Sequence, residues 1–376
     1  MHKISYPQMG DYHVPIKYLL SHVLNAEIIE PPKITAKTVE IGSKNSPNTI
    51  CMPFKYTLGT MIEALDKGAD TLIQMGGGCR YGYYAELQEE VLKEKGYKFQ
   101  MINLVTEGKT NYKRIKKLFK KIDPKFSQIK LIKYTFITLK MVKYMDEIDN
   151  YIRENIGFEK VKGSFENLKR KMLKSFSETK GYLDLKRKYN RYKEEFQKLE
   201  IEKKGSIKIG IIGELYTIME PYSNYFLEKQ LASHHIEIKR FTNVHYLLIK
   251  KSKRMKKYLK QNKRIKYMMG ADASDNIANT EYLCKHKYDG IIHIKSSFCT
   301  PEIGAMSIIN KIASENNIPV LFFSFDEATS EVGIKTRLEA FYDMLEMRKK
   351  SAWMLFRGRY RINIYKRSNY FLYYIK

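Results

Sequence analysis

The stretch TLIQMGGGCRYGYYAELQEEVLKEKG, residues 71–96, contains the pattern that decides the fold. Thr71–Met75 is a short apolar run that predicts a buried strand. The three glycines at 76–78 follow it and predict a turn in which the backbone approaches its neighbours closely. Cys79 ends this turn, and Tyr84–Lys95 has the apolar spacing of an amphipathic helix. A strand, a tight turn and a helix in this order predict one βα unit of a parallel sheet.

The same alternation of apolar runs and amphipathic stretches extends in both directions from this unit. Further strands in the first part of the chain are expected at Lys3–Tyr6, Glu27–Ile29, Thr49–Met52 and Lys98–Ile102. The helices between them are expected at Val14–Val23, Lys37–Ser43 and Leu58–Lys67. In the second half, strands are expected at Lys208–Ile212, Glu237–Phe241, Gly290–Ile294 and Val320–Phe323, with helices at Asn276–His286 and Ile303–Glu315. The sequence therefore predicts an α/β protein with two parallel-sheet lobes.

The segment between the two lobes has a different pattern. Residues 109–203 contain one proline, long helical periodicity and few strand-like runs. They carry 27 Lys and Arg against 13 Asp and Glu, a net charge of +14. We therefore expect a basic helical segment that joins the lobes. The predicted domains are an N-terminal lobe at 1–108, the helical segment at 109–205, a second lobe at 206–350 and a basic aromatic tail at 351–376.

Composition indicates a folded chain of several domains. The sequence has 376 residues, and 43% of them are hydrophobic, which is enough to form buried cores. No run of about 18 apolar residues predicts a membrane span, and residues 1–10 lack the apolar core of a secretory signal. Four cysteines are too few for a disulfide framework in a chain of this length. We therefore expect a cytoplasmic protein with free thiols.

A formal net charge of +27 permits attraction to nucleic acid, anionic membranes or phosphorylated ligands. No recognition helix, zinc finger or RNA-binding signature accompanies this charge, so we interpret it as background and expect no specific nucleic-acid partner. Lys250–Lys266 has ten Lys or Arg in 17 residues at helical spacing, which fits a solvated helix face or a docking surface for an acidic partner. The tail at 351–376 fits a terminal strand, a partner-docking extension or a loosely ordered end better than a surface for single-stranded nucleic acid or membrane.

Three of the four cysteines lie where α/β lobes carry their functional loops, beyond the carboxyl ends of strands. Cys51 ends one expected strand, Cys79 follows the glycine turn, and Cys299 follows a strand of the second lobe. Each of them precedes a helix. Helix N-termini, together with Arg80 beside one thiol and Lys295 near another, should lower the thiol pKa values and favour the thiolate form that binds metals.

The glycines before Cys79 allow two interpretations. Gly76, Gly77 and Gly78 would let backbone N–H groups approach thiolate or sulfide sulfurs closely. Phosphate binding is the competing interpretation. However, the segment lacks the downstream Lys-Ser/Thr of a P-loop and the spacing of a dinucleotide fingerprint.

Three thiolates without a fourth nearby ligand suit an iron-sulfur cluster with one open iron better than structural zinc, which takes four ligands at CxxC-type spacing. His286 or His293 would have to complete a zinc site, and His293 is equally expected in the core. We interpret Cys284, on an expected helix, as a buried structural thiol. Acidic residues near the cysteine loops in sequence, none of which is singled out as a proton carrier, are Glu63, Glu86 and Glu302.

The spacing and context of the three cysteines resemble a known family. Cys51, Cys79 and Cys299 occur in the segments CMPFKYTLG, QMGGGCRYGYY and KSSFCTPEIG. In these segments the chain resembles the 2-hydroxyacyl-CoA dehydratase and benzoyl-CoA reductase superfamily, in particular the dehydratase D-component. It is most similar to stand-alone members related to the acyl-CoA dehydratase activase system. The resemblance extends over residues 1–349.

This resemblance implies two Rossmann-like or flavodoxin-like lobes that hold one [4Fe-4S] cluster through Cys51, Cys79 and Cys299. It also implies an ATP-dependent activase that supplies low-potential electrons for the radical dehydration or reduction of an acyl-CoA or another small molecule. In the dehydratases, one such electron makes a ketyl radical from a 2-hydroxyacyl-CoA. Because the family enzymes work as paired subunits, a homodimer and a heterodimer are both open. The alternative functions are a non-catalytic iron-sulfur accessory or electron-carrier subunit and a zinc-stabilised basic binding protein.

Overall fold

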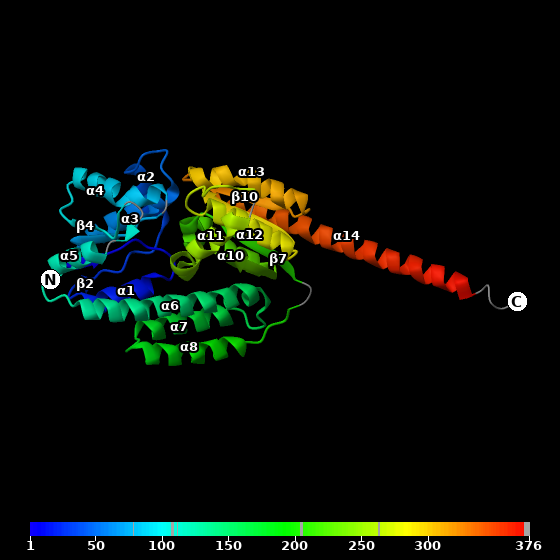
Figure 1. Ribbon diagram of the computed structural model, residues 1–376, viewed down its shortest axis with the longest axis horizontal. Coiled ribbons are helices and arrows are strands. Elements are labelled where there is room, and N and C mark those ends of the chain that lie inside the picture. The colour runs from blue at the N-terminus through cyan, green and yellow to red at the C-terminus, as the bar shows by residue number, and fades with distance from the viewer. Residues whose placement is uncertain (78, 107–108, 111, 204–205, 262–263, 372–376) are drawn as a thin grey trace. The chain divides into compact units, whose positions relative to one another are not determined.

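The computed structural model describes residues 1–77, 79–106, 109–110, 112–203, 206–261 and 264–371. It is an α/β protein with two four-stranded sheets, both entirely parallel and flanked by helices (Figure 1). The predicted fold class is confirmed. The chain separates into two compact units, residues 1–329 and residues 330–376, and both sheets belong to the first.

The first sheet has the strand order β2-β1-β3-β4. Its strands are β1 (Lys3–Ser5), β2 (Glu27–Ile28), β3 (Thr71–Gln74) and β4 (Gln100–Asn103). The helices of this lobe are α1 (His13–Val23), α2 (Ala36–Lys44), α3 (Met52–Asp66), the short 3-10 helix η1 (Arg80–Tyr83) and α4 (Tyr84–Glu94). Strand β3 is buried at every position, as its apolar sequence predicted. The strand–turn–helix unit of residues 71–96 is therefore confirmed.

One predicted strand is wrong. Residues 49–51 form no strand, and Met52 is the first residue of α3. Pro53 lies in the first turn of that helix, where a missing N–H and a fixed φ favour helix initiation. A four-residue apolar run cannot by itself distinguish a strand from the start of a buried helix.

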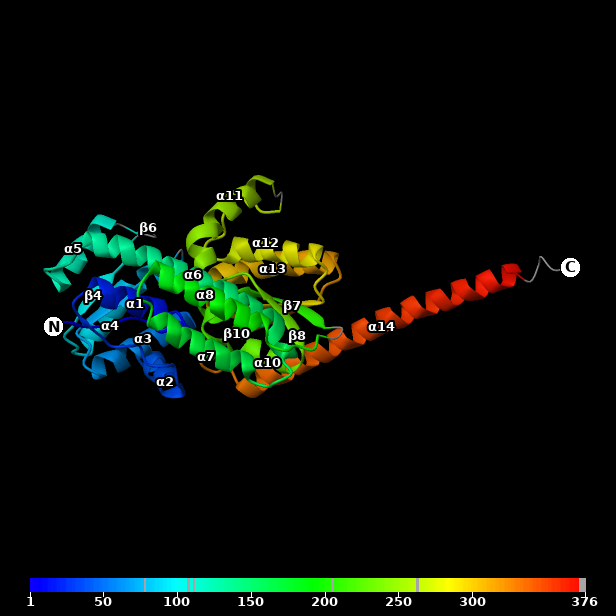
Figure 2. The same cartoon turned by 90° about the horizontal axis from the view of Figure 1, so that it is seen from below.

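The middle segment is helical apart from a two-stranded antiparallel ribbon at its start. The ribbon is formed by β5 (Val105–Thr106) and β6 (Lys109–Thr110). The helices are α5 (Tyr112–Ile122), α6 (Gln128–Asn155), η2 (Ile156–Phe158), α7 (Ser164–Ser177) and α8 (Tyr182–Gln197). Helix α6 packs against α1 of the first lobe and against β8 of the second, and α7 and α8 lie beside it (Figures 1 and 2). Fully buried Phe165, Met172 and Phe196 fill the space between these helices.

The second sheet has the order β10-β9-β7-β8. Its strands are β7 (Ile207–Gly213), β8 (Ile236–Arg240), β9 (Gly290–Ser296) and β10 (Val320–Phe325), so all four predicted strands are present. The helices of this lobe are α9 (Leu215–Met219), η3 (Pro221–Asn224), α10 (Leu227–Ser233), the π-helix η4 (Tyr246–Lys250), α11 (Lys251–Gln261), α12 (Ala273–Lys285) and α13 (Thr300–Glu315). Gly213 ends β7 with φ +148°, and a Cβ there would lie 1.8 Å from the carbonyl oxygen of Ile294. Only glycine fits this position.

The second unit consists mainly of α14 (Glu331–Phe371). Residues 351–371 of the expected tail continue this helix, so the terminal strand considered for them is wrong. In the described part of the chain, no helix combines the length and the apolar character needed to cross a membrane.

Candidate functional site

The three cysteines predicted as ligands all stand at helix starts. Cys51 is the N-cap residue of α3, Cys299 is the N-cap residue of α13, and Cys79 immediately precedes η1. The Cys79 sulfur also accepts the backbone N–H of Tyr81 at 3.5 Å. N–H groups at a helix start carry partial positive charge, which favours a negatively charged ligand or sulfur.

These cysteines line one cavity of about 590 Å³. Cys51 and Cys79 come from the lobe of the first sheet, and Cys299 comes from the lobe of the second. The remaining lining residues are Arg80, Met269, Gly270, Phe298, Thr300, Pro301 and Gly304. No carboxylate is among them. Residues separated by up to 248 positions in the sequence (51 to 299) are therefore brought to one space.

Polar contacts connect the cysteine loops to one another. The backbone N–H of Met52, next to Cys51, donates to the Ser296 hydroxyl at 2.9 Å. The Arg80 guanidinium, next to Cys79, donates to the carbonyl oxygen of Phe298 at 2.5 Å. Fully buried Lys55, on α3, pairs with Glu327 at 3.0 Å. Each contact joins the first lobe to the second, and the first two involve residues that line the cavity or adjoin its cysteines.

The expected lowering of the thiol pKa values is wrong. Burial raises the pKa of Cys79 to about 11, and it also raises the pKa values of Cys51 and Cys299. The positive charge of Arg80 lowers the pKa of Cys51, but this effect is smaller than the cost of burying a thiolate. The thiols are thus neutral at physiological pH until a metal displaces their protons.

The glycine turn is compact. A Cβ on Gly76 would come within 3.1 Å of the Val105 side chain and 3.2 Å of the Gly82 backbone, and one on Gly77 would come within 3.3 Å of Tyr81. Neither glycine has a positive φ, so close packing, and not a left-handed backbone, favours glycine at these positions. Gly78 lies outside the described residues.

Sequence reasoning missed Glu214, which follows β7 as the N-cap residue of α9. Its carboxylate accepts the backbone N–H groups of Tyr216 at 2.8 Å and Thr217 at 2.9 Å. Burial raises the pKa of Glu214 to about 7. Its negative charge in turn contributes to the raised pKa of all three cysteines. Like Cys79 and Cys299, Glu214 lies just beyond the carboxyl end of a strand, so the same rule could have found it. The strand expected to end at Cys51 is absent, so the rule does not hold for that cysteine.

The remaining candidates have structural partners. Glu302 is fully buried and accepts from His293 at 2.7 Å and from Asn276 at 3.0 Å. Cys284 belongs to a hydrophobic cluster and does not line the cavity. Other residues considered as ligands or proton carriers bond elsewhere, namely His286 to Tyr282, Glu63 to Thr38 and Glu86 to Asn103.

The three cysteine thiols can be compared with the needs of a single zinc ion and of an iron-sulfur cluster. Among the described residues, no three His, Cys, Asp or Glu side chains are grouped tightly enough to hold a metal ion. Two thiolates on one zinc ion lie within about 4.6 Å of each other, because each Zn–S bond is about 2.3 Å. Thiolates on different irons of one cluster are not subject to this limit. Three thiols around one cavity, without a carboxylate, therefore fit a cluster better than a single ion.

Together, the fold and this cavity define an α/β protein in which thiols from two parallel-sheet lobes converge on one space. The sequence model of the 2-hydroxyglutaryl-CoA dehydratase D-component family matches residues 35–345, a range that includes all three cysteines. The chain belongs to this family, and the resemblance seen in its cysteine segments is confirmed. No curated protein matches the chain.

Proposed function

We propose that the chain binds one [4Fe-4S] cluster through Cys51, Cys79 and Cys299. The observation that carries this proposal is the convergence of the thiols of three N-cap residues on a single cavity. Family membership supports it, because the resemblance to this dehydratase family implies one such cluster. When bound, the cluster would supply one-electron chemistry at low potential.

The chain's own residues would hold and shield this group. Coordination would deprotonate the three thiols, and the helix starts behind them would stabilise the negative charge. Phe298 and Pro301 line the cavity and would restrict the access of water to it. The hydrogen bond from Arg80 to the carbonyl oxygen of Phe298 would help to hold the two lobes together around the cavity. Glu214, whose pKa is about 7, can hold or release a proton behind the thiols near neutral pH.

As the partner we propose an ATP-dependent activase that delivers the electrons, and as the substrate an acyl-CoA or another small molecule. The cavity volume of about 590 Å³ lies within the range of small-molecule sites, so it has room for a reacting group beside the thiols. The reaction would be the radical dehydration or reduction that the dehydratase family suggests.

The test is turnover of a 2-hydroxyacyl-CoA by anaerobically purified protein with an activase, ATP and a reductant. Formation of the enoyl-CoA supports the enzymatic function. If the activase reduces the cluster but no substrate is consumed, the chain is an accessory electron carrier. Colourless protein with stoichiometric zinc would instead identify the zinc-stabilised binding protein.

A further inference from the structure

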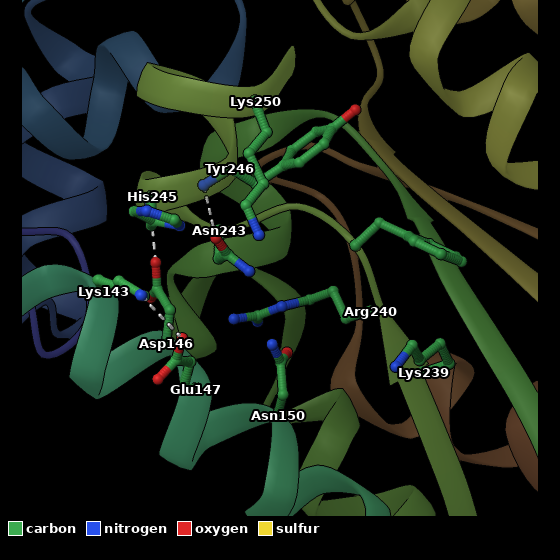
Figure 3. A pocket seen from close by; sticks show the side chains of 11 residues that line it. Lys143, Asp146, Glu147, Asn150, Lys239, Arg240, Asn243, His245, Tyr246 and Lys250 are labelled. Atoms are coloured by element: carbon green, nitrogen blue, oxygen red, sulfur yellow. Dashed lines mark hydrogen bonds and ion pairs between the residues drawn. The ribbon is translucent and has the colours of Figure 1, made fainter. Parts of the chain in front are cut away.

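A second cavity lies beyond the carboxyl end of β8, remote in sequence from the cysteines. It has a volume of about 210 Å³ and is bounded by α6, β8 and η4. Figure 3 shows four groups that face its interior, namely the Arg240 guanidinium, the amides of Asn150 and Asn243 and the Lys250 ammonium. At about 30 Å³ per water, the volume corresponds to about seven waters, which is room for a small ion.

The hydrogen-bond acceptors around this cavity are already occupied. Asp146 accepts from the Tyr12 hydroxyl at 2.6 Å and from the backbone N–H of His245 at 2.8 Å. Glu147 accepts from the Tyr189 hydroxyl at 2.7 Å and lies 3.6 Å from Lys143. Both carboxylates therefore already accept hydrogen bonds from the protein.

The two amides have fixed orientations that leave donors toward the cavity. The Asn243 carbonyl oxygen accepts the backbone N–H of Tyr246 at 2.8 Å, so its NH₂ group is the free end. The Asn150 carbonyl oxygen accepts from the Arg153 guanidinium at 3.1 Å, so the NH₂ group of Asn150 is also the free end. Neither NH₂ group has a partner among the described residues.

Two cationic groups add to these donors. Arg240 is only 7% exposed, and its Nη1 donates to the Glu228 carboxylate and to the carbonyl oxygen of Ile218, each at 2.7 Å. Its Nε–H has no hydrogen-bond partner in the described part of the chain. Lys250 makes no ion pair with any described residue. Burial lowers the pKa of His245, and the positive charges of Lys250 and Lys143 lower it further. The donors without a partner among the described residues are thus the two NH₂ groups, the Arg240 Nε–H and the Lys250 ammonium, and together they complement an oxyanion.

We propose that this cavity binds a phosphate group, either as the free ion or as the end of a larger small molecule. Donors from three separate elements, α6, β8 and η4, approach from different directions and suit a tetrahedral oxyanion better than a planar carboxylate. The site shares no lining residue with the cysteine cavity, so the proposal does not depend on an iron-sulfur cluster.

The test is titration of the full chain with inorganic phosphate by isothermal calorimetry at constant ionic strength, with ADP as a second ligand. Saturable binding at one site per chain is expected. Lys250→Gln should weaken it about tenfold, because one charged hydrogen bond is lost. Asn243→Asp keeps the acceptor for Tyr246 but replaces the free donor by a carboxylate oxygen, and it should weaken binding about 100-fold. Lys253→Gln is the matched control, since Lys253 is an exposed lysine of α11 outside the cavity.

Tighter binding of ADP than of phosphate would identify the phosphate as part of a larger ligand, and equal or weaker binding would identify the free ion. Absence of saturable phosphate binding would overturn the proposal. Binding that survives Lys250→Gln unchanged would also overturn it, even if Asn243→Asp fails to fold, because the Lys250 side chain has no ion pair with a described residue to lose.

Discussion

At the scale of single residues, Glu214 has the widest influence on the cysteine cavity. Its charge raises the pKa values of Cys51, Cys79 and Cys299 together. Glu214→Gln keeps the size of the side chain and removes the charge. We expect the cluster-free variant to react several-fold faster with iodoacetamide at Cys79, because a larger fraction of the thiol is ionised at a given pH.

Mass spectrometry of the alkylated peptides measures this rate for each thiol. Glu63→Gln is the control, because Glu63 bonds to Thr38 and does not contribute to the pKa of any of the three thiols. An unchanged alkylation rate in Glu214→Gln would show that its carboxylate does not act on the thiols.

Asp146 gives the molecule a predictable pH dependence. Burial raises its pKa to about 6 from an ordinary value of 3.8, although hydrogen bonds from Tyr12 and His245 oppose the shift. The folded state therefore binds this proton more tightly than the unfolded chain does. The contribution to stability is complete below about pH 4 and is lost as the pH rises through 6, by about 3 kcal/mol in total.

Urea unfolding between pH 4 and 7 in a phosphate-free buffer measures this contribution, with Asp146→Asn as the reference. The free energy of unfolding of the wild type, relative to Asp146→Asn, should fall across that interval. If both proteins show the same pH dependence, Asp146 titrates normally in the folded state.

The three cysteines of the site could be predicted from the sequence, but the raised pKa values of their thiols could not. Cys79 and Cys299 follow strands β3 and β9 as predicted, whereas the strand expected before Cys51 is absent; what all three share is a position at a helix start. The raised pKa values depend on burial between two lobes, which no local pattern reports. Likewise, the pairing of Glu302 with His293 and Asn276 joins three separate elements and has no sequence signature.

At the scale of elements, α11 and the residues after it contain basic side chains that form ion pairs and exposed lysines that form none with described residues. Lys251, Arg254 and Arg264 pair with acidic residues of the same lobe, Asp272, Asp275 and Glu315 respectively. The exposed lysines, which make no ion pair with described residues, are Lys253, Lys256, Lys257 and Lys260. Figure 2 shows α11 projecting beside α12, and the chain that follows it reaches the cysteine cavity at Met269 and Gly270.

We expect these four lysines to steer an acidic redox partner toward the cavity. Changing all four to Gln should slow reduction by the activase about tenfold at low salt and flatten its salt dependence, because steering acts through screened charge. Stopped-flow reduction at several salt concentrations measures this. Removing the same number of exposed lysines from α7 and α8, by changing Lys171, Lys174, Lys186 and Lys193 to Gln, controls for net charge. Equal slowing in both variants would leave α11 without a specific role.

Helices and strands were predicted well where the hydrophobic pattern extended over many residues. Most of the expected helices and the remaining strands lie within a few residues of their predicted positions, whereas Thr49–Met52 did not form a strand and the helix expected from Leu58 begins at Met52. Helix α3 is buried on nearly all sides and begins with the largely apolar residues Met52, Pro53 and Phe54, so its start resembles a buried strand. Pro53 was the local signal for a helix start.

At the scale of the whole molecule, the cysteine cavity depends on both sheets at once. The first lobe supplies two thiols and the second supplies one, and contacts of Met52, Arg80 and Lys55 join the two lobes. The sequence predicted the two lobes and their cysteines separately. Their meeting depends on contacts between residues more than 200 positions apart, which hydrophobic periodicity does not encode.

The most direct test of the account is the iron and acid-labile sulfide content of anaerobically purified protein. We predict about four iron and four sulfide per chain in the wild type. Cys284→Ala should retain this content because Cys284 lies in a hydrophobic core, whereas Cys51→Ala, Cys79→Ala and Cys299→Ala should lose most of it. Wild-type protein without iron, or full cluster content in any of those three variants, would contradict the assignment.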